Sequence, residues 1–301
     1  MTPLQRYIAE EIAADHADGL LNRREALRRL GLLGFGVPAA AALLAACSSG
    51  DNDQPASLQP SSPTTTSAPP GSSSALPTTP ITFPGPDNRE LQGAWAGSPE
   101  PRGGVLVIHE NKGLTDHIRS VAGRFAGAGY SALAIDLLSA KGGTAAFTDP
   151  AAATAELSKT PQQQLLADLR AGLDELGRRV PGKKLGATGF CFGGGLAWLL
   201  LTAGPSALAA ATPFYGPFPD NGDFAASKAA VLGVYAAKDA RIDATRQAAT
   251  AALERAGTPH EIWVAPDADH AFFNDTGPRY SPVAAEEAWR RVLGWYGEHL
   301  G

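Results

Sequence analysis

The sequence predicts an α/β fold in which a mostly parallel sheet is covered by helices on both faces. Short apolar runs bounded by turn residues recur through the C-terminal part of the chain, and continuous apolar runs are typical of parallel strands buried on both sides. Amphipathic helical patterns lie between them, and this alternation indicates a parallel sheet. The net charge of −5, with 44% hydrophobic and 18% charged residues, is typical of a mildly acidic globular protein and argues against nucleic acid as a partner.

The N-terminal residues have the pattern of an export signal. Arg23 and Arg24 precede a charge-free run over residues 30–46, which is interrupted by glycines and a proline and ends in Leu44-Ala45-Ala46-Cys47. The run is shorter than the roughly 20 strongly apolar residues that span a bilayer as a permanent helix, so we expect a cleaved segment. Twin arginines resemble the signals of the twin-arginine route, and Leu-Ala-Ala-Cys resembles a bacterial lipobox, whose cysteine is acylated and becomes the mature N-terminus. The alternatives are a buried Ala-rich helix, or cleavage without lipidation of Cys47.

Residues 48–80 have the composition of a flexible tether. Of these 33 residues, 9 are Ser, 5 Thr, 7 Pro and 2 Gly, and almost none could bury apolar surface. We therefore expect a signal peptide over residues 1–46, a lipidated Cys47 at the head of a disordered linker (47–80), and one folded domain over residues 81–301. This organisation predicts an extracytoplasmic protein that its N-terminal lipid holds to the membrane.

The expected strands of the folded domain are short apolar runs between turn residues. They lie at residues 104–109, 130–136, 184–189, 209–215, 230–235 and 261–264. Thr160, Pro161 and Gln163 match an N-cap, a proline at the first helical position and a capping-box partner, so a helix is expected to begin there. The last helix follows an i, i+3, i+4, i+7 apolar pattern from Ala285 to Tyr296. Ligands of such sheets bind beyond the carboxyl ends of the strands, where a site is expected.

A nucleophile elbow follows the expected strand 184–189. The segment Gly189-Phe190-Cys191-Phe192-Gly193-Gly194 matches the pattern G-x-nucleophile-x-G, with Cys191 where serine is commoner. The glycines allow the close backbone approach of a strained strand-to-helix turn, and the N-terminus of the following helix favours a thiolate. The alternatives are a small buried cysteine and a phosphate-binding loop, although no Lys-Ser/Thr pair follows the glycines as a P-loop requires.

Two loops near the C-terminus contain an acid and a base for this nucleophile. Asp239 follows the expected strand 230–235, and His270 lies in the loop before the last helix. Either residue alone is weak evidence, because loop aspartates usually serve turns and loop histidines are usually solvated. Their order after Cys191 is that of the α/β-hydrolases, with separations of 48 and 31 residues, and this joint placement favours His270 as the base.

A second group of polar residues follows the expected strand 104–109. A carboxylate at Glu110, near the thiol, would keep the thiol protonated or accept its proton, and a backbone N–H after the strand would face the substrate oxygen. Metal binding by His109, Glu110 and His117 is an alternative, but the spacing is not H-E-x-x-H and we expect no metal. The other alternative is that Glu110 only caps a helix that begins near Leu114.

These residues together resemble the dienelactone hydrolase family over about residues 81–301. The matching segments are Val107-Ile108-His109-Glu110, Gly113-Leu114, Ile118-Arg119, Gly129-Tyr130, Asp136-Leu137, the elbow, Asp239, His270-Ala271-Phe272, Tyr280, Ala284-Ala285 and Trp289. The resemblance implies an α/β-hydrolase fold, a triad of Cys191, Asp239 and His270, and Glu110 as a carboxylate that pairs with the thiol until substrate displaces it. It also implies an oxyanion hole formed by the backbone N–H groups of Asn111 and Phe192. The leader and the linker depart from the family, whose members that open dienelactones are typically cytosolic, and this departure leaves the substrate open.

The expected function is hydrolysis of an ester or lactone by a carboxymethylenebutenolidase-like enzyme through an acyl-cysteine intermediate. The expected partners are a small-molecule ester or lactone substrate and the membrane, with no nucleic acid, metal or organic cofactor. The rival hypothesis is a non-catalytic extracytoplasmic binding or scaffold protein that retains the fold. A degenerate protein of that kind would be expected to lack one of the four matching side chains at positions 110, 191, 239 and 270, and all four are present.

Overall fold

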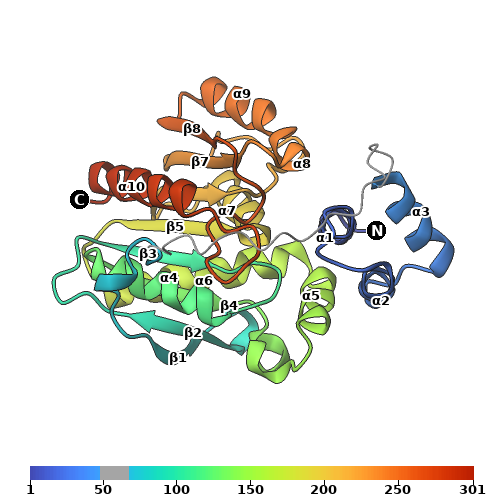
Figure 1. Ribbon diagram of the computed structural model, residues 1–301. Coiled ribbons are helices and arrows are strands. Elements are labelled where there is room, and N and C mark those ends of the chain that lie inside the picture. Colours follow the sequence, from blue (N-terminus) through green and yellow to red (C-terminus); the bar gives the residue numbers. More distant parts are fainter. Residues whose placement is uncertain (48–67) are drawn as a thin grey trace. The chain divides into compact units, whose positions relative to one another are not determined.

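The computed structural model describes residues 1–47 and 68–301, and these residues form two compact units (Figure 1). The larger unit contains residues 68–146 and 163–301, and the smaller one joins the N-terminal helices to residues 147–162. This grouping differs from the expected boundaries, because residues 147–162 come from within the expected domain. Residues 48–67 of the expected linker lie outside the described residues.

Four helices form the described part of the smaller unit. They are α1 (Pro3–Ala17), α2 (Arg23–Leu32), α3 (Val37–Cys47) and α5 (Pro150–Lys159). α1 and α2 contact each other, and both contact α3 and α5, while Arg28 of α2 donates at 2.7 Å to Asp149, the N-cap of α5. The charge-free run is divided between α2 and α3 by a turn at Gly34 (φ 93°). Within the part of the chain that the structure describes, no helix has the length and hydropathy needed to cross a membrane.

An eight-stranded sheet forms the core of the larger unit. Its strands are β1 (Thr79–Pro84), β2 (Glu90–Ala96), β3 (Gly103–Ile108), β4 (Tyr130–Asp136), β5 (Leu185–Phe190), β6 (Leu208–Phe214), β7 (Ala230–Ala236) and β8 (His260–Ala265). Their order across the sheet is β1-β2-β4-β3-β5-β6-β7-β8. β2 pairs antiparallel with β1 and β4, and the remaining neighbours pair parallel. The sheet is therefore mostly parallel, as the sequence predicts.

Helices cover both faces of this sheet (Figure 1). The helices of the larger unit are α4 (Asp116–Gly127), α6 (Gln162–Arg179), α7 (Phe192–Thr202), α8 (Ala240–Asp243), α9 (Arg246–Ala256) and α10 (Pro282–His299). Successive residues of a strand point to opposite faces. In β3, position Gly103 faces Leu300, just after α10, whereas Gly104 faces Leu176 of α6. α4 packs beside α10 through aromatic rings, and α6 is hydrogen-bonded to the end of α7, so the expected two-sided covering is confirmed.

The elements agree with the expected ones except at two places. All six expected strands are present, to within one residue at each end. The sequence does not predict the β1–β2 hairpin, because Pro80 and Pro84 argue against a strand and are tolerated here only at the edge of the sheet. The expected capping box is wrong, since the hydroxyl of Thr160 donates to the carbonyl of Glu156 at 3.2 Å and closes α5, while α6 begins at Gln162.

The ordered part of the larger unit begins inside the expected linker. Residues Ser72–Ser74 form one turn of 3-10 helix, and the N–H of Leu76 donates to the carbonyl of Gly123 in α4 at 3.0 Å. A Cβ at Gly123 would lie 2.4 Å from the carbonyl oxygen of Leu76, and one at Gly127 would lie 2.0 Å from that of Ser74. Two glycines one turn apart on α4 therefore make room for this segment, and residues 72–80 belong to the folded unit rather than to a tether.

Candidate active site

The candidate site lies at the carboxyl edge of the sheet, where the strand order reverses. The chain places β4 on one side of β3 and β5 on the other, and ligands of open α/β sheets bind at such switch points. Glu110 follows β3 and Cys191 follows β5, while Asp239 and His270 follow β7 and β8. Because these strands run parallel, all four residues lie at one edge of the sheet.

Cys191 occupies the tight turn between β5 and α7. Its φ of 56° and ψ of −115° lie in a region that residues other than glycine rarely adopt. A Cβ at Gly189 would lie 2.0 Å from the carbonyl oxygen of Gly193, and one at Gly193 would lie 2.4 Å from that of Ile108. Both positions therefore require glycine. The turn places the buried Cys191 at the N-terminus of α7, where the helix dipole and unpaired helical N–H groups favour negative charge.

His270 is held by Asp239 near the thiol of Cys191. Nδ1 of His270 lies 2.5 Å from Oδ2 of Asp239, and a ring nitrogen of His270 lies within 4.8 Å of Sγ of Cys191. Asp239 is also the N-cap of α8, since its Oδ1 accepts the N–H of Ile242 at 3.3 Å. Acid, imidazole and thiol thus lie in the order that nucleophilic catalysis uses.

The surroundings of Asp239 favour its ionised form. Burial raises the pKa of this carboxyl, but the hydrogen bond and charge of His270, the charge of Arg241 and the N–H of Ile242 together lower the pKa by more. The net result is a pKa below the usual value for aspartate. Asp239 is therefore ionised at neutral pH and orients the ring of His270.

Glu110 is bound by an amide from the loop that carries His270. Its Oε2 accepts a hydrogen bond from Nδ2 of Asn274 at 2.7 Å, and the residue is buried. α4 begins at Asp116 with Thr115 as its N-cap, so Glu110 does not cap this helix. The alternative that Glu110 serves only as a helix cap is therefore not supported.

His109, next to Glu110, has a structural role. The ring is fully buried, with Nδ1 donating to the carbonyl of Glu110 at 2.6 Å and Nε2 accepting the N–H of Leu137 at 3.1 Å. Burial lowers the pKa of His109, and the charge of Asp136 only partly opposes this effect, so the ring is neutral. It joins the ends of β3 and β4, and neither nitrogen is available as a metal ligand.

Asn111 and Phe192 lie at matching points just after neighbouring strands. Ile108 at the end of β3 pairs with Gly189 of β5. Asn111 comes three residues after Ile108, and Phe192 comes three residues after Gly189. Phe192 is the first residue of α7, a position whose N–H has no partner within the helix. The structure therefore brings both positions to the edge where Cys191 lies.

Tyr215 belongs to the same edge, although no motif in the sequence marks it as a site residue. It follows β6 with an unusual φ of 33°, and its ring meets that of His270 edge-on, with centroids 5.2 Å apart. Burial raises the pKa of its hydroxyl well above the usual value, and the charges of Glu110 and Cys191 raise it further. The phenol thus stays protonated beside these groups. The feature of the sequence that could have indicated Tyr215 is its place at the end of the expected strand 209–215, which follows the elbow in the chain.

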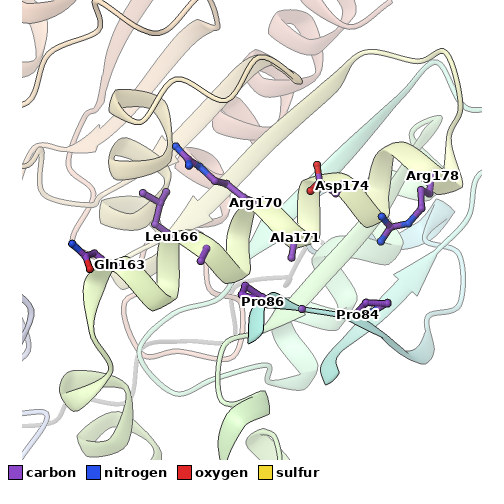
Figure 2. Close-up of a pocket in the computed structure, with 10 residues that line it drawn as sticks. Pro84, Pro86, Gln163, Leu166, Arg170, Ala171, Asp174 and Arg178 are labelled. Carbon is purple, nitrogen blue, oxygen red and sulfur yellow. The ribbon is translucent and has the colours of Figure 1, made fainter. Parts of the chain in front are cut away.

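A groove beside α6 does not coincide with this site. Figure 2 shows the groove, of about 560 Å³, between one side of α6 and the residues around Pro84 and Pro86. None of the expected site residues lines it. Two of its charged side chains have partners, because Arg170 donates to the carbonyl of Ala203 and Arg178 pairs with Glu175. This groove is therefore separate from the candidate site, which the geometry around Cys191 locates.

The sheet, the elbow and the acid–histidine pair define an α/β-hydrolase. The chain belongs to the dienelactone hydrolase family, whose model matches residues 91–300. It is 34% identical over 214 residues to an Escherichia coli K12 protein described as a carboxymethylenebutenolidase, which covers 65% of this chain and 77% of the relative. A protein of Methylorubrum extorquens with the same description is 35% identical over 219 residues, or 67% of this chain and 74% of that protein.

Solved structures agree with this assignment. A Klebsiella pneumoniae protein described as a dienelactone hydrolase matches with a TM-score of 0.65 and 31% identity, over 74% of this chain and 99% of that one. A dienelactone hydrolase-like promiscuous phosphotriesterase from metagenomic libraries matches with a TM-score of 0.64 and 27% identity, over 75% and 100%. The comparisons confirm the predicted family and fold class and identify the chain as a hydrolase.

Proposed function

We propose that this protein hydrolyses a small ester or lactone through an acyl-cysteine intermediate on Cys191. The observation that carries the proposal is the alignment of Asp239, His270 and Cys191 at a nucleophile elbow. A thiol nucleophile suits activated, conjugated esters and lactones better than plain amides. The descriptions of the relatives as carboxymethylenebutenolidases and dienelactone hydrolases support a lactone as one substrate class.

His270 moves the proton in each half of the reaction. Ionised Asp239 keeps a proton on Nδ1 of His270, so Nε2 takes the proton of the Cys191 thiol. The thiolate forms a C–S bond to the carbonyl carbon, and the ester C–O bond breaks as the leaving oxygen receives that proton. Water then transfers a proton to His270 and attacks the thioester, the C–S bond breaks, and the proton returns to the thiolate as the acid departs. With a lactone, the leaving hydroxyl remains attached to the acyl group.

The backbone N–H groups of Asn111 and Phe192 stabilise the oxyanion of both tetrahedral intermediates. Their matching positions just after β3 and β5 support this role, because two donors from neighbouring strand ends can converge on one oxygen beside the thiol. One such donor typically contributes ~3–4 kcal/mol to the transition state.

Glu110 restrains the thiol of the resting enzyme. Glu110 and Cys191 follow the neighbouring strands β3 and β5, and the charges of both act on the hydroxyl of Tyr215. A carboxylate beside the thiol keeps it protonated until substrate displaces that contact. Outside the cytosol this restraint protects Cys191, because an exposed thiolate there is oxidised with no reducing pool to reverse the damage.

The enzyme is exported and tethered to a membrane through a lipid on Cys47. The support is the order of the leader: exposed Arg23 and Arg24, the weakly apolar run, and the Leu-Ala-Ala-Cys motif. Cleavage before Cys47 removes nearly all of α3 together with α1 and α2, the two helices that contact α5 in the smaller unit.

A substrate panel on the full chain tests the reaction. Small aryl esters, conjugated five-membered lactones and matched amides are assayed with the wild type and with Cys191→Ala. We expect turnover of esters and lactones by the wild type, little turnover of amides, and none of either by Cys191→Ala with an unchanged unfolding temperature. Equal turnover by the variant would refute the covalent mechanism. Binding without turnover of any member by the wild type would favour the rival non-catalytic protein.

A further inference from the structure

The loop that carries His270 is fastened to its surroundings by side chains outside the triad. The carbonyl of Phe272 accepts the N–H of Ser281 at 3.0 Å, which closes the loop before α10. Between these two points, Asn274 contacts Glu110 and Asp275 contacts α4. These two contacts join the loop to the residues that follow β3.

Asn274 is oriented from within the loop. Its Oδ1 accepts the backbone N–H of Thr276 at 3.0 Å and the hydroxyl of Thr276 at 2.7 Å. Because the oxygen end of the amide accepts these two bonds, the nitrogen end is the one that faces Glu110 and donates to its Oε2 at 2.7 Å. Glu110 is therefore held by a residue only four positions after His270.

Asp275 fastens the same loop to α4. Its Oδ1 lies 2.6 Å from Nδ1 of His117, and its Oδ2 accepts from a terminal guanidinium nitrogen of Arg124 at 2.8 Å. The side chains of His117 and Arg124 are each only 1% exposed. Nε of Arg124 also donates to Ser120 on the same helix, so the guanidinium presents a fixed face to Asp275.

The charge on Asp275 makes this contact strong. Burial raises the pKa of Asp275, but the hydrogen bonds and charges of His117 and Arg124 lower it to about 2. Burial and the charge of Asp275 raise the pKa of the Tyr280 hydroxyl. Removing the carboxylate would leave Arg124 buried without its counter-charge, which is far more costly than the loss of a surface pair.

We propose that Asp275 and Asn274 are positioning residues, in which Asp275 fixes the His270 loop on α4 and Asn274 sets the position of Glu110 relative to Cys191. Neither side chain needs to touch substrate, because each acts through Glu110 or His270. The inference deepens the proposed function and rests on it. Its consequence is that the base and the restraining carboxylate move together, since one short loop holds both.

Substitution of Asn274 tests the link to Glu110. Asn274→Ala keeps the Asp275 ion pairs and removes the hydrogen bonds of Asn274 to Glu110 and Thr276. We expect the pH at which iodoacetamide labels Cys191 to shift in the same direction as in Glu110→Gln. In the double variant Asn274→Ala/Glu110→Gln, the shift should equal that of Glu110→Gln alone, because the two changes remove one interaction. Additive shifts, or an unchanged profile in Asn274→Ala, would overturn the proposal.

Substitution of Asp275 tests the anchor on α4. Asp275→Asn keeps the size of the side chain and removes its charge, and we expect kcat to fall about 10- to 100-fold with little change in KM, because the reacting groups are misplaced. Asp168→Asn is the control, since Asp168 also pairs with an arginine, Arg89, at 2.6 Å, is itself buried, and lies outside the candidate site. Equal losses in the two variants would show a general loss of stability and overturn the proposal.

The two readouts separate this inference from the proposed function. Labelling of Cys191 needs no substrate, so an inactive wild type would refute the proposed reaction while the labelling profiles still test the positioning. If Asp275→Asn fails to fold, Asn274→Ala still decides the proposal. A wild-type kcat and labelling profile in both Asn274→Ala and Asp275→Asn would refute it outright.

Discussion

Cys191 holds a strained backbone conformation, and its neighbours compensate for the strain. A left-handed φ costs a residue with a side chain on the order of 1–3 kcal/mol. Its N–H donates to the carbonyl of Phe214 and its carbonyl accepts the N–H of Gly195, both at 3.1 Å. The backbone rather than side-chain packing therefore places Sγ, so position 191 keeps its geometry when the nucleophile changes.

Replacing the sulfur with oxygen should separate geometry from reactivity. We expect Cys191→Ser to unfold near the wild-type temperature but to lose about 100-fold or more in kcat/KM, or ~3 kcal/mol of transition-state free energy. The reason is that a serine hydroxyl is far harder to deprotonate than a thiol at the same distance from His270. Ester hydrolysis and thermal unfolding measure the two effects, and full activity would mean that residue 191 is not the nucleophile.

Neutralising Glu110 should change the reactivity of the Cys191 thiol while the protein stays folded. If the carboxylate restrains the thiol, Glu110→Gln lowers ester turnover and shifts the pH at which iodoacetamide labels Cys191 without substrate. If Glu110 has only a structural role, Glu110→Gln instead lowers the free energy of unfolding, typically by ~1 kcal/mol, and leaves the labelling curve unchanged. Normal turnover with a wild-type curve would remove Glu110 from the active site.

Among the elements, α7 and the His270 loop decide the geometry of the site. α7 approaches β5 and β3 so closely that two positions at the elbow have no space for a side chain. The loop reaches α4 through Asp275 and reaches the end of β3 through Asn274. The site therefore depends on how neighbouring elements are joined as well as on its own residues.

A methyl group added at the elbow should destabilise the protein far more than one added at an open position of a helix. Gly189→Ala places a Cβ 2.0 Å from the carbonyl oxygen of Gly193, so we expect a loss of at least ~2 kcal/mol in the free energy of unfolding. Gly294→Ala is the control, because nothing lies within 4 Å of that position in α10, and alanine there should stabilise the helix by ~0.5–1 kcal/mol. Chemical denaturation of both variants measures the difference, and equal effects would contradict the close approach.

Acid should loosen the attachment of the His270 loop to α4. The pKa of Asp275 is lowered from 3.8 to about 2 in the folded protein, so its ionised form stabilises the fold above the unfolded pKa. That contribution, ~2 kcal/mol, is lost as the pH falls from about 4 towards 2. We expect Asp275→Asn to flatten this part of the stability curve, as measured by denaturation at several pH values. A curve parallel to that of the wild type would contradict the assignment.

For the whole molecule, the expected order is a leader, a tether and an enzyme, yet the structure groups the leader helices with residues 147–162. Export of a folded protein through the twin-arginine route is compatible with a leader that is itself helical, because that route does not require unfolding. Processing would then release α5 from its contacts with α1 and α2. The hydrolase unit, with its own sheet and core, does not depend on those helices for its strands.

For the whole molecule, we predict that Cys47 is lipidated. The mature protein should begin with a lipid-modified Cys47 in a membrane fraction, and Cys47→Ala should leave the protein unprocessed or move it to the soluble extracytoplasmic fraction. In the processed form, the amides of α5 should exchange faster with deuterium, because the contacts with α1 and α2 are gone. Mass spectrometry measures both effects. An intact N-terminus on soluble, active protein would refute the leader hypothesis.

Local patterns of the sequence were sufficient for most of the fold and for expecting Cys191, Asp239 and His270 at one edge of the sheet. Six strands, the last helix and the elbow follow from burial periodicity and glycine spacing, which are properties of short segments. The order Cys191, Asp239, His270 along the chain was enough to expect them together, because residues that follow parallel strands reach one edge of the sheet. The edge hairpin β1–β2 was missed because its prolines hide a strand that only an edge position permits.

The tertiary structure alone decided the partners of those residues. Glu110 and Asn274 are 164 positions apart, and Arg124 and Asp275 are 151 apart, so no local pattern connects them. Tyr215 likewise comes beside His270 only because β6 lies between β5 and β7. The sequence by itself determined most of the elements and the candidate residues that meet at one edge of the sheet, since both depend on short-range sterics and burial. The order of strands across the sheet decided which side chains hold the reacting groups in place, because that order sets every long-range contact at the edge.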